Sequence, residues 1–180
     1  LVSGSRAKTI MAINNARKPL NDVRVRRAIA AAIDRKAVID GAAEGYGVPI
    51  GSYYVPSAFG YVDTTGINPY DLDKAKALLA EAGVKLPMTL TMTLPPAPYA
   101  RQGGEVIAAQ LAKIGIEVKL QNVEWAQWLS GTYGNKNYDL TIISHVEPFD
   151  LGNFAKPDYY WGYNSPKFND LFNQIKNAAR

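Results

Sequence analysis

Cysteine is absent from this 180-residue chain, and histidine occurs only once, as His145. Without thiols the chain has no disulfide, no thiol nucleophile and no cysteine ligands for zinc. A cysteine-free composition fits an oxidising compartment, although many cytosolic proteins share it. Histidine-based metal sites usually use two or more histidines, or carboxylates that converge with one. A single imidazole therefore argues against such a site.

Long apolar runs are absent as well. No stretch approaches eighteen consecutive apolar residues, so the sequence predicts no membrane-spanning helix. The opening residues, LVSGSRAKTIMAINN, lack the succession of charged, apolar and small residues found in a signal peptide. We therefore expect a chain that is mature, processed or excised from a larger protein. Its length, with 47% hydrophobic and 20% charged residues, suits one domain spanning 1–180.

The net charge of +4 comes partly from one basic segment, ARKPLNDVRVRRA. A basic cluster can contact the phosphate backbone of a nucleic acid. Here, however, Val25, Ala28 and Ile29 recur at the spacing of one helix face, whereas Arg24 and Arg27 fall outside it. We interpret the cluster as the solvated side of an amphipathic helix and expect no nucleic-acid partner.

The alternation of apolar periods predicts an α/β fold. Strands are expected at 7–14, 88–94, 116–122 and 138–144. Helices are expected at 21–34, 34–42, 70–83, 100–114, 124–134 and 165–180. The strand–helix–strand unit over 88–122 should be right-handed with parallel strands, and YDLTIIS is apolar enough to be buried on both faces. The expected architecture is a mostly parallel sheet flanked by helices.

Some helix ends and one helix face can also be assigned from the sequence. We expect caps at Asn21 or Asp22, at Asp71 and at Ser165. In the last helix, the residues expected to face inward are Phe168, Leu171, Phe172 and Ile175. Residues 44–69 match neither period, and a long connection of this kind is usually functional or wraps over the surface.

The segment SHVEPFDLGNF, residues 144–154, follows the predicted buried strand and contains His145, Glu147 and Asp150. Together these could bind a hard cation, and the two acids could act as an acid–base pair of a glycoside hydrolase. Alternatively, Asp150 caps a short helix or turn that starts at Leu151, and Glu147 pairs with a surface lysine. Glu147 and Asp150 are three residues apart in a loop, and this spacing does not decide among these roles.

A second loop, PDYYWGYNSP, gathers three tyrosines and a tryptophan within 157–166. Aromatic loops stack on bases or sugars and line apolar pockets, but they also close the edge of a core. Tyr160 and Trp161 are candidates for either role.

Four longer segments occur in order and at fitting intervals. They are NNARKPLNDVRVRRAIAAAIDRKAVIDG, NPYDLDKAKALLAEAG, IAAQLAKIGIEVKLQNVEW and YDLTIIS. Together they resemble the C-terminal lobe of the family 5 extracellular solute-binding proteins, over about 3–172. These are the dipeptide-, oligopeptide- and nickel-binding components of ABC importers.

The resemblance implies a type II periplasmic-binding-protein lobe that closes over a small peptide or another solute together with an N-terminal lobe. It implies a C-terminal lobe excised from a longer two-lobe chain, and docking of the closed form on the membrane permease of an ABC importer. It also implies a periplasmic or other extracytoplasmic location, lipid-anchored forms included, no enzyme activity and no cofactor. The alternatives are a metal chelate or sugar as solute, the sensing half of a transcriptional regulator, and a carboxylate-dependent hydrolase.

The resemblance also suggests site residues. Peptide-binding members have a loop resembling W-x-x-D-Y-x-D-P, whose first aspartate pairs with the peptide's ammonium group. Matching the NF at 153–154 puts Glu147 at that aspartate and Asp150 at the second. The chain departs from the pattern because the tryptophan is missing, the loop is shorter, and Leu151 stands where proline is usual. The expected ligand-binding residues are His145, Glu147, Phe149, Asp150, Tyr160 and Trp161, with none catalytic or metal-binding.

Overall fold

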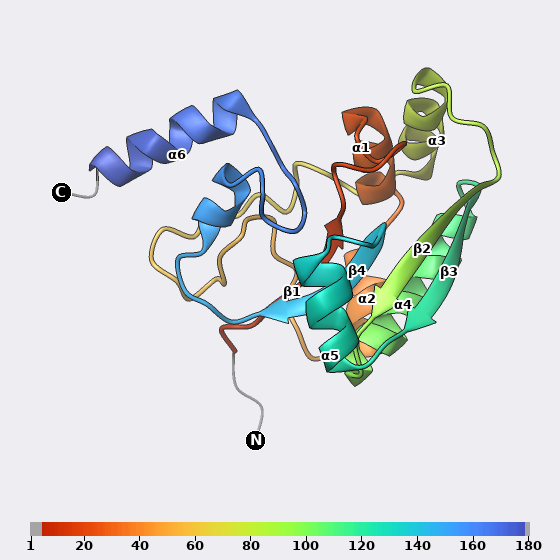
Figure 1. The fold of residues 1–180 in the computed structure, drawn as a ribbon, viewed down its shortest axis with the longest axis horizontal. Coiled ribbons are helices and arrows are strands. Elements are labelled where there is room, and N and C mark those ends of the chain that lie inside the picture. The colour runs from red at the N-terminus through yellow and green to blue at the C-terminus, as the bar shows by residue number, and fades with distance from the viewer. Residues whose placement is uncertain (1–4, 179–180) are drawn as a thin grey trace.

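The computed structural model describes residues 5–178, and within them four strands form one sheet (Figure 1). They are β1 (Lys8–Ile13), β2 (Met88–Leu94), β3 (Ile116–Asn122) and β4 (Leu140–His145). The order is β1-β4-β2-β3, with β2 parallel to β3 and β4, and β1 antiparallel to β4. The predicted mostly parallel sheet is confirmed, and its antiparallel strand lies at an edge.

The helices follow the predicted order. They are α1 (Val23–Ala31), α2 (Arg35–Ala42), α3 (Leu72–Glu81), α4 (Pro98–Ala112), α5 (Trp125–Gln127) and α6 (Pro166–Ala178). The carboxylates of Asp22 and Asp71 accept backbone amides at the starts of α1 and α3, and the hydroxyl of Ser165 accepts one at the start of α6. These predicted caps are confirmed.

The helix expected at 124–134 has two parts. After α5 the chain continues as a π-helix, η1 (Trp128–Gly134). A 3₁₀ turn, η2 (Leu151–Ala155), follows β4.

The predicted strand–helix–strand unit over 88–122 is confirmed, with Met88 opposite Ile116 in parallel register. Helix α4 lies close to β2, since a Cβ on Gly104 would stand 2.6 Å from Cδ1 of Leu94.

Two apolar clusters are built around the sheet, and β4 contributes to both. Leu140 and Ile142 belong to the larger cluster, which also contains apolar residues of α1, α3 and α4. Ile143 belongs to a smaller, aromatic cluster with Trp128, Tyr138, Tyr160 and Trp161. The strand is therefore buried on both faces, as predicted from YDLTIIS.

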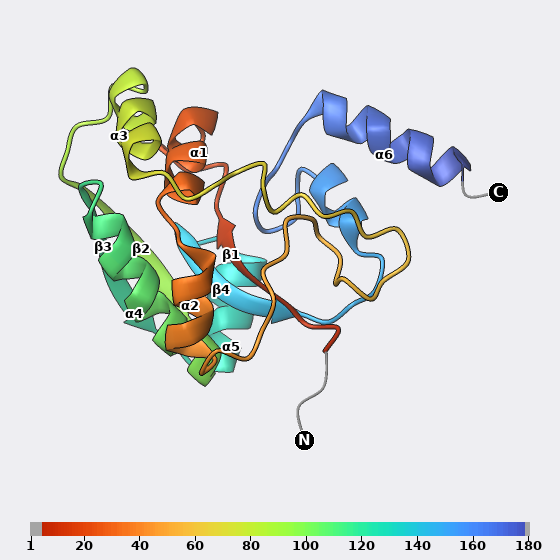
Figure 2. The ribbon, with the colours of Figure 1, turned by 180° about the vertical axis from the view of Figure 1, so that it is seen from behind.

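Helix α6 lies beside η2, away from the sheet (Figures 1 and 2). Phe168 and Phe172 are half-buried, and the Phe172 ring packs against Gly152. Leu171 and Ile175 remain 47% and 53% exposed. The prediction that all four apolar residues point inward is wrong for these two, because the described chain places no further layer against that face.

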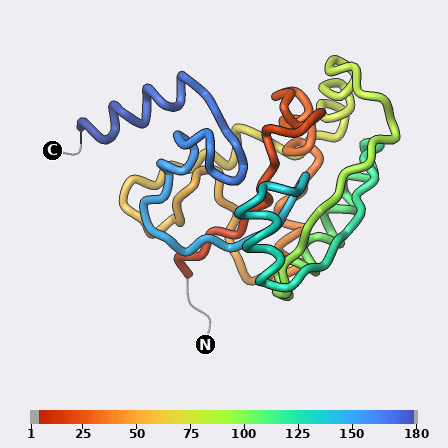
Figure 3. The backbone as a smooth tube through the Cα atoms, in the orientation of Figure 1, coloured from red at the N-terminus to blue at the C-terminus, as the bar shows by residue number. Residues whose placement is uncertain are grey.

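The long connection at 44–69 contains no helix or strand. It passes beside the segment that follows β4 (Figure 3). Tyr53 is 8% exposed, and its ring meets that of Phe154 at a centroid distance of 5.0 Å. The connection thus contributes a buried aromatic residue next to residues 146–150, the loop that contains Glu147 and Asp150.

Candidate functional site

The acidic loop, residues 146–150, begins where β4 ends, at the carboxyl end of the parallel strands β2 and β4. In open α/β sheets, ligands bind outside the carboxyl ends of the strands, where loops of different strands meet. The fold therefore places the loop at the edge of the sheet where a ligand site is expected.

Asp150 points into the protein. Its side chain is 4% exposed and forms an ion pair with Lys8, whose side chain is 3% exposed. The Lys8 ammonium also donates to the backbone oxygen of Glu147 at 2.9 Å and lies 4.4 Å from the centroid of the Tyr53 ring. The carboxylate of Asp150 is thus occupied by a cation of the chain itself.

Glu147 and Phe149 point the other way. Both are exposed, Phe149 to 68%, with its ring 6.2 Å from that of Tyr54. Within residues 5–178, no hydrogen bond or ion pair engages the Glu147 carboxylate. Glu147 is therefore the acid of the loop that a solute can reach.

His145, the last residue of β4, is part of the wall behind the loop. A hydrogen bond of 2.7 Å joins its Nε2 atom to the hydroxyl of Tyr160. Burial lowers the pKa of His145, because the charged imidazolium loses solvation, and the nearby Asp150 carboxylate opposes this only in part. The imidazole is consequently neutral near pH 7.

Tyr160 and Trp161 are 2% and 3% exposed, inside the aromatic cluster. Trp161 stacks on Phe154 at a centroid distance of 4.6 Å, and burial raises the pKa of Tyr160 above its usual range. Of the two interpretations of their loop, the structure favours closure of the core edge. Ligand contact by these rings stays a prediction.

The cation-site and acid–base alternatives receive no geometric support. Within the described part of the chain, no three His, Cys, Asp or Glu side chains gather as metal ligands. Asp150 is paired with Lys8 and His145 is bonded to Tyr160, while Glu147 points outward. The two acids therefore do not face a common space.

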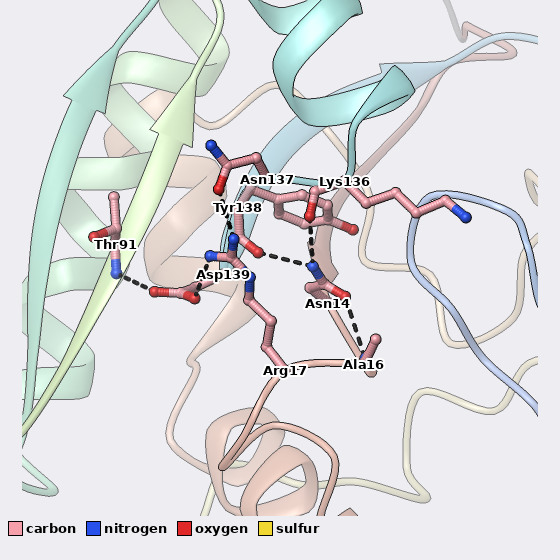
Figure 4. Close-up of polar contacts among 8 residues, drawn as sticks. All are labelled: Asn14, Ala16, Arg17, Thr91, Lys136, Asn137, Tyr138 and Asp139. Carbon is pink, nitrogen blue, oxygen red and sulfur yellow. Dashed lines mark hydrogen bonds and ion pairs between the residues drawn. The ribbon is translucent and has the colours of Figure 1, made fainter.

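A polar network ties the opposite end of β4 to β1 (Figure 4). The Asn14 amide donates to the backbone oxygens of Lys136 and Tyr138, at 3.0 and 2.9 Å. Arg17 donates to Asp139 at 3.2 Å, and the other carboxylate oxygen of Asp139 accepts the amide of Thr91. These bonds hold β1, β2 and β4 together, which keeps the acidic loop on a rigid base.

The sequence indicated neither Lys8 nor Tyr53 as part of the site. Lys8 lies on the edge strand, opposite His145 in the β1–β4 register. Tyr53 lies in the irregular 44–69 connection. The only signal for Lys8 is a lysine at the start of an apolar strand, and nothing local indicates its distant partner.

An open pocket of ≈ 290 Å³ lies between β2, β3 and η1. Its lining is uncharged and mostly polar, with Thr93, Gln121, Gln127 and Asn137 among the residues. The pocket contains none of the predicted site residues.

No helix of residues 5–178 combines the length and apolarity needed to cross a bilayer.

Comparison with known proteins adds a family context. The model of the bacterial extracellular solute-binding proteins, family 5 Middle, matches residues 3–170. The dipeptide-binding protein of Escherichia coli (strain K12) is 36% identical over 124 residues, which are 66% of this chain and 23% of that protein. The chain thus spans less than a third of the length of the curated relatives it matches.

Two solved structures are similar to this fold. The periplasmic binding protein DppA from Helicobacter pylori, in complex with peptide STSA, has a TM-score of 0.86 and 26% identity, covering 98% of this chain and 36% of that one. AgaA from A. tumefaciens R10, in complex with agropinic acid, has a TM-score of 0.83 and 28% identity, covering 94% and 37%. The α/β fold class implied by the resemblance is confirmed.

Proposed function

Because the chain belongs to the family 5 bacterial extracellular solute-binding proteins, we propose that it is one ligand-binding lobe of a receptor that delivers a peptide to an ABC importer. The lobe is the C-terminal one of a two-lobe protein and closes over the solute with an N-terminal lobe. The closed protein docks on a membrane permease outside the cytoplasm. Binding involves no turnover, only a shift towards the closed conformation.

The observation that carries the proposal is the exposed Glu147 carboxylate at the carboxyl end of β4. A carboxylate at that edge is suited to the ammonium group of a peptide. The resulting charge-assisted hydrogen bond is roughly twice as strong as a neutral one. It strengthens further as closure removes water, because the local dielectric constant falls. The names of the curated dipeptide-binding relative and of the peptide-bound structure support the same ligand class.

The first experiment is a native mass spectrum of the intact protein, purified without denaturation. Calorimetry with the dipeptide Met-Leu and with N-acetyl-Met-Leu, which lacks the ammonium, follows. Glu147→Gln should weaken Met-Leu binding by roughly 10- to 100-fold. Glu105→Gln, at an exposed acid on α4, is the matched control and should change nothing. Equal binding of Met-Leu by the Glu147→Gln variant and the natural protein would remove Glu147 from the site.

A solute other than a peptide is the second candidate. Two observations favour it, namely the departures of the acidic loop from the peptide-binding pattern and the 28% identity to AgaA bound to agropinic acid. The native mass spectrum separates the candidates. A co-purified peptide mass supports the first candidate, whereas an opine, sugar or metal-chelate mass supports the second, and a chelate would direct attention to His145.

A further inference from the structure

We propose that Lys8 is the positioning residue of the ligand site, holding the 146–150 loop in the conformation that presents the Glu147 side chain to the solute. This inference rests on the proposed function, in which Glu147 contacts the solute. It gives the two acids of the loop different roles, because Glu147 binds the solute and Asp150 anchors the loop to Lys8. Lys8 itself touches no solute.

The position of Lys8 is determined by the sheet. Lys8 stands opposite His145 in the antiparallel β1–β4 register, so its side chain starts beside the last residue before the loop. The side chain is 3% exposed, which requires the ammonium to find partners inside the protein. It finds the Asp150 carboxylate, the Glu147 backbone oxygen and the face of the Tyr53 ring.

These contacts bracket the strained part of the loop. Phe149 has a φ of +55°, a left-handed conformation that bulky residues seldom adopt. Such a conformation persists only where the surroundings hold it in place. Lys8 binds the backbone of Glu147 on one side of Phe149 and the side chain of Asp150 on the other. One ammonium thus fixes both ends of the turn, with the Glu147 side chain left pointing outward.

Asp150 is at the same time withdrawn from the solute. A carboxylate, a carbonyl oxygen and an aromatic face form a typical environment for an ammonium group, and Lys8 already occupies it. The Asp150 side chain is 4% exposed, so an incoming ammonium cannot reach it. Recognition of the solute cation therefore depends on Glu147 alone within this loop.

The test measures binding of Met-Leu and N-acetyl-Met-Leu to the intact protein carrying Lys8→Met, Lys8→Arg, Glu147→Gln, and Lys8→Met with Glu147→Gln. We expect Lys8→Met to weaken Met-Leu binding about tenfold and to leave N-acetyl-Met-Leu binding unchanged, because only the Glu147 contact is lost. Lys8→Arg should recover most of the affinity. In the Glu147→Gln background, Lys8→Met should have no further effect.

Lys8→Met leaves Asp150 buried without its partner, so the variant can fail to fold. The double replacement, Lys8→Met with Asp150→Leu, removes both charges and fills the buried position with apolar side chains. It should show the same loss of Met-Leu affinity. Lys36→Met, at an exposed ion pair with Asp40, is the control and should bind as the natural protein does.

The outcomes separate the two proposals. If Glu147→Gln weakens Met-Leu binding but neither Lys8→Met nor the double replacement does, the proposed function stands and the positioning role is overturned. If both peptides lose affinity equally on replacing Lys8, the lysine serves general folding and the inference again fails. If Glu147→Gln has no effect, the Glu147 contact is refuted and the inference falls with it.

Discussion

Lys8 and Asp150 lie 142 residues apart in the chain and form an ion pair in which neither side chain is more than 4% exposed. Burial makes both members depend on each other, because a lone charge in this environment has no solvent to stabilise it. The pair joins the edge strand β1 to the loop after β4, so the stability of the fold and the geometry of this loop depend on the same contact.

Removing only the cation should be costly. Lys8→Met leaves the Asp150 carboxylate buried and unpaired, and we expect the free energy of unfolding to fall by about 3–5 kcal/mol. Replacing both residues, Lys8→Met with Asp150→Leu, should recover most of that loss. Urea denaturation of the two variants measures the difference. A single replacement as harmless as Lys36→Met, at the exposed pair with Asp40, would show that the buried pair contributes nothing.

The contrast between strands and site shows what local sequence determines. Strands β2 and β3 have the predicted residues, since alternation of apolar side chains depends only on neighbours within each strand. The caps Asp22 and Asp71 were likewise predictable from a few adjacent residues. The partners of a residue across the sheet are not encoded locally.

For that reason the sequence left several roles open for each acid of the loop, and it did not indicate that Asp150 is buried while Glu147 is exposed. Only the three-dimensional register brings Lys8 beneath the loop and gives Asp150 an internal partner. The prediction that the apolar face of α6 is buried was wrong for a related reason. Apolar periodicity at Leu171 and Ile175 shows that a face is suited to burial, but not that the described chain supplies a surface to cover it.

His145 should make stability depend on pH. Burial lowers its pKa in the folded protein below the ordinary value of 6.5, so the unfolded chain binds a proton more readily than the folded one. The stabilisation is complete above 6.5 and is lost as pH falls through that value towards the folded-state pKa. His145 is the sole histidine, which simplifies the experiment.

The measurement compares the free energy of unfolding of the natural chain and of His145→Gln from about pH 8 to about pH 5. The difference between them should shift in favour of the variant on acidification. A constant difference, or one shifting the other way, would contradict a buried neutral imidazole bonded to Tyr160.

Helix α6 supplies a prediction of small effects. Leu171→Gln and Ile175→Gln replace side chains that are about half exposed, and glutamine keeps a good helix propensity. In the 180-residue chain each should change the free energy of unfolding by less than about 0.5 kcal/mol. Leu79→Ala, at a residue that is 0% exposed in α3, should cost about 2–5 kcal/mol and calibrates the assay. Losses of that size in α6 would mean that its apolar face is covered.

Asn14 should matter far more than its neighbour Arg17, although both belong to the network at the amino end of β4. Asn14 is 2% exposed, donates to the carbonyls of Lys136 and Tyr138, and accepts the amide of Ala16 at 3.2 Å. Asn14→Ala leaves these three backbone groups, which are buried or partly buried, without their hydrogen-bond partner. It should cost about 1–3 kcal/mol, measured by urea denaturation. Arg17 has a 40% exposed side chain, and its partner Asp139 retains the Thr91 amide, so Arg17→Ala should cost less than about 1 kcal/mol. Equal losses would mean that the surface ion pair, and not the buried amide, holds β1 against β4.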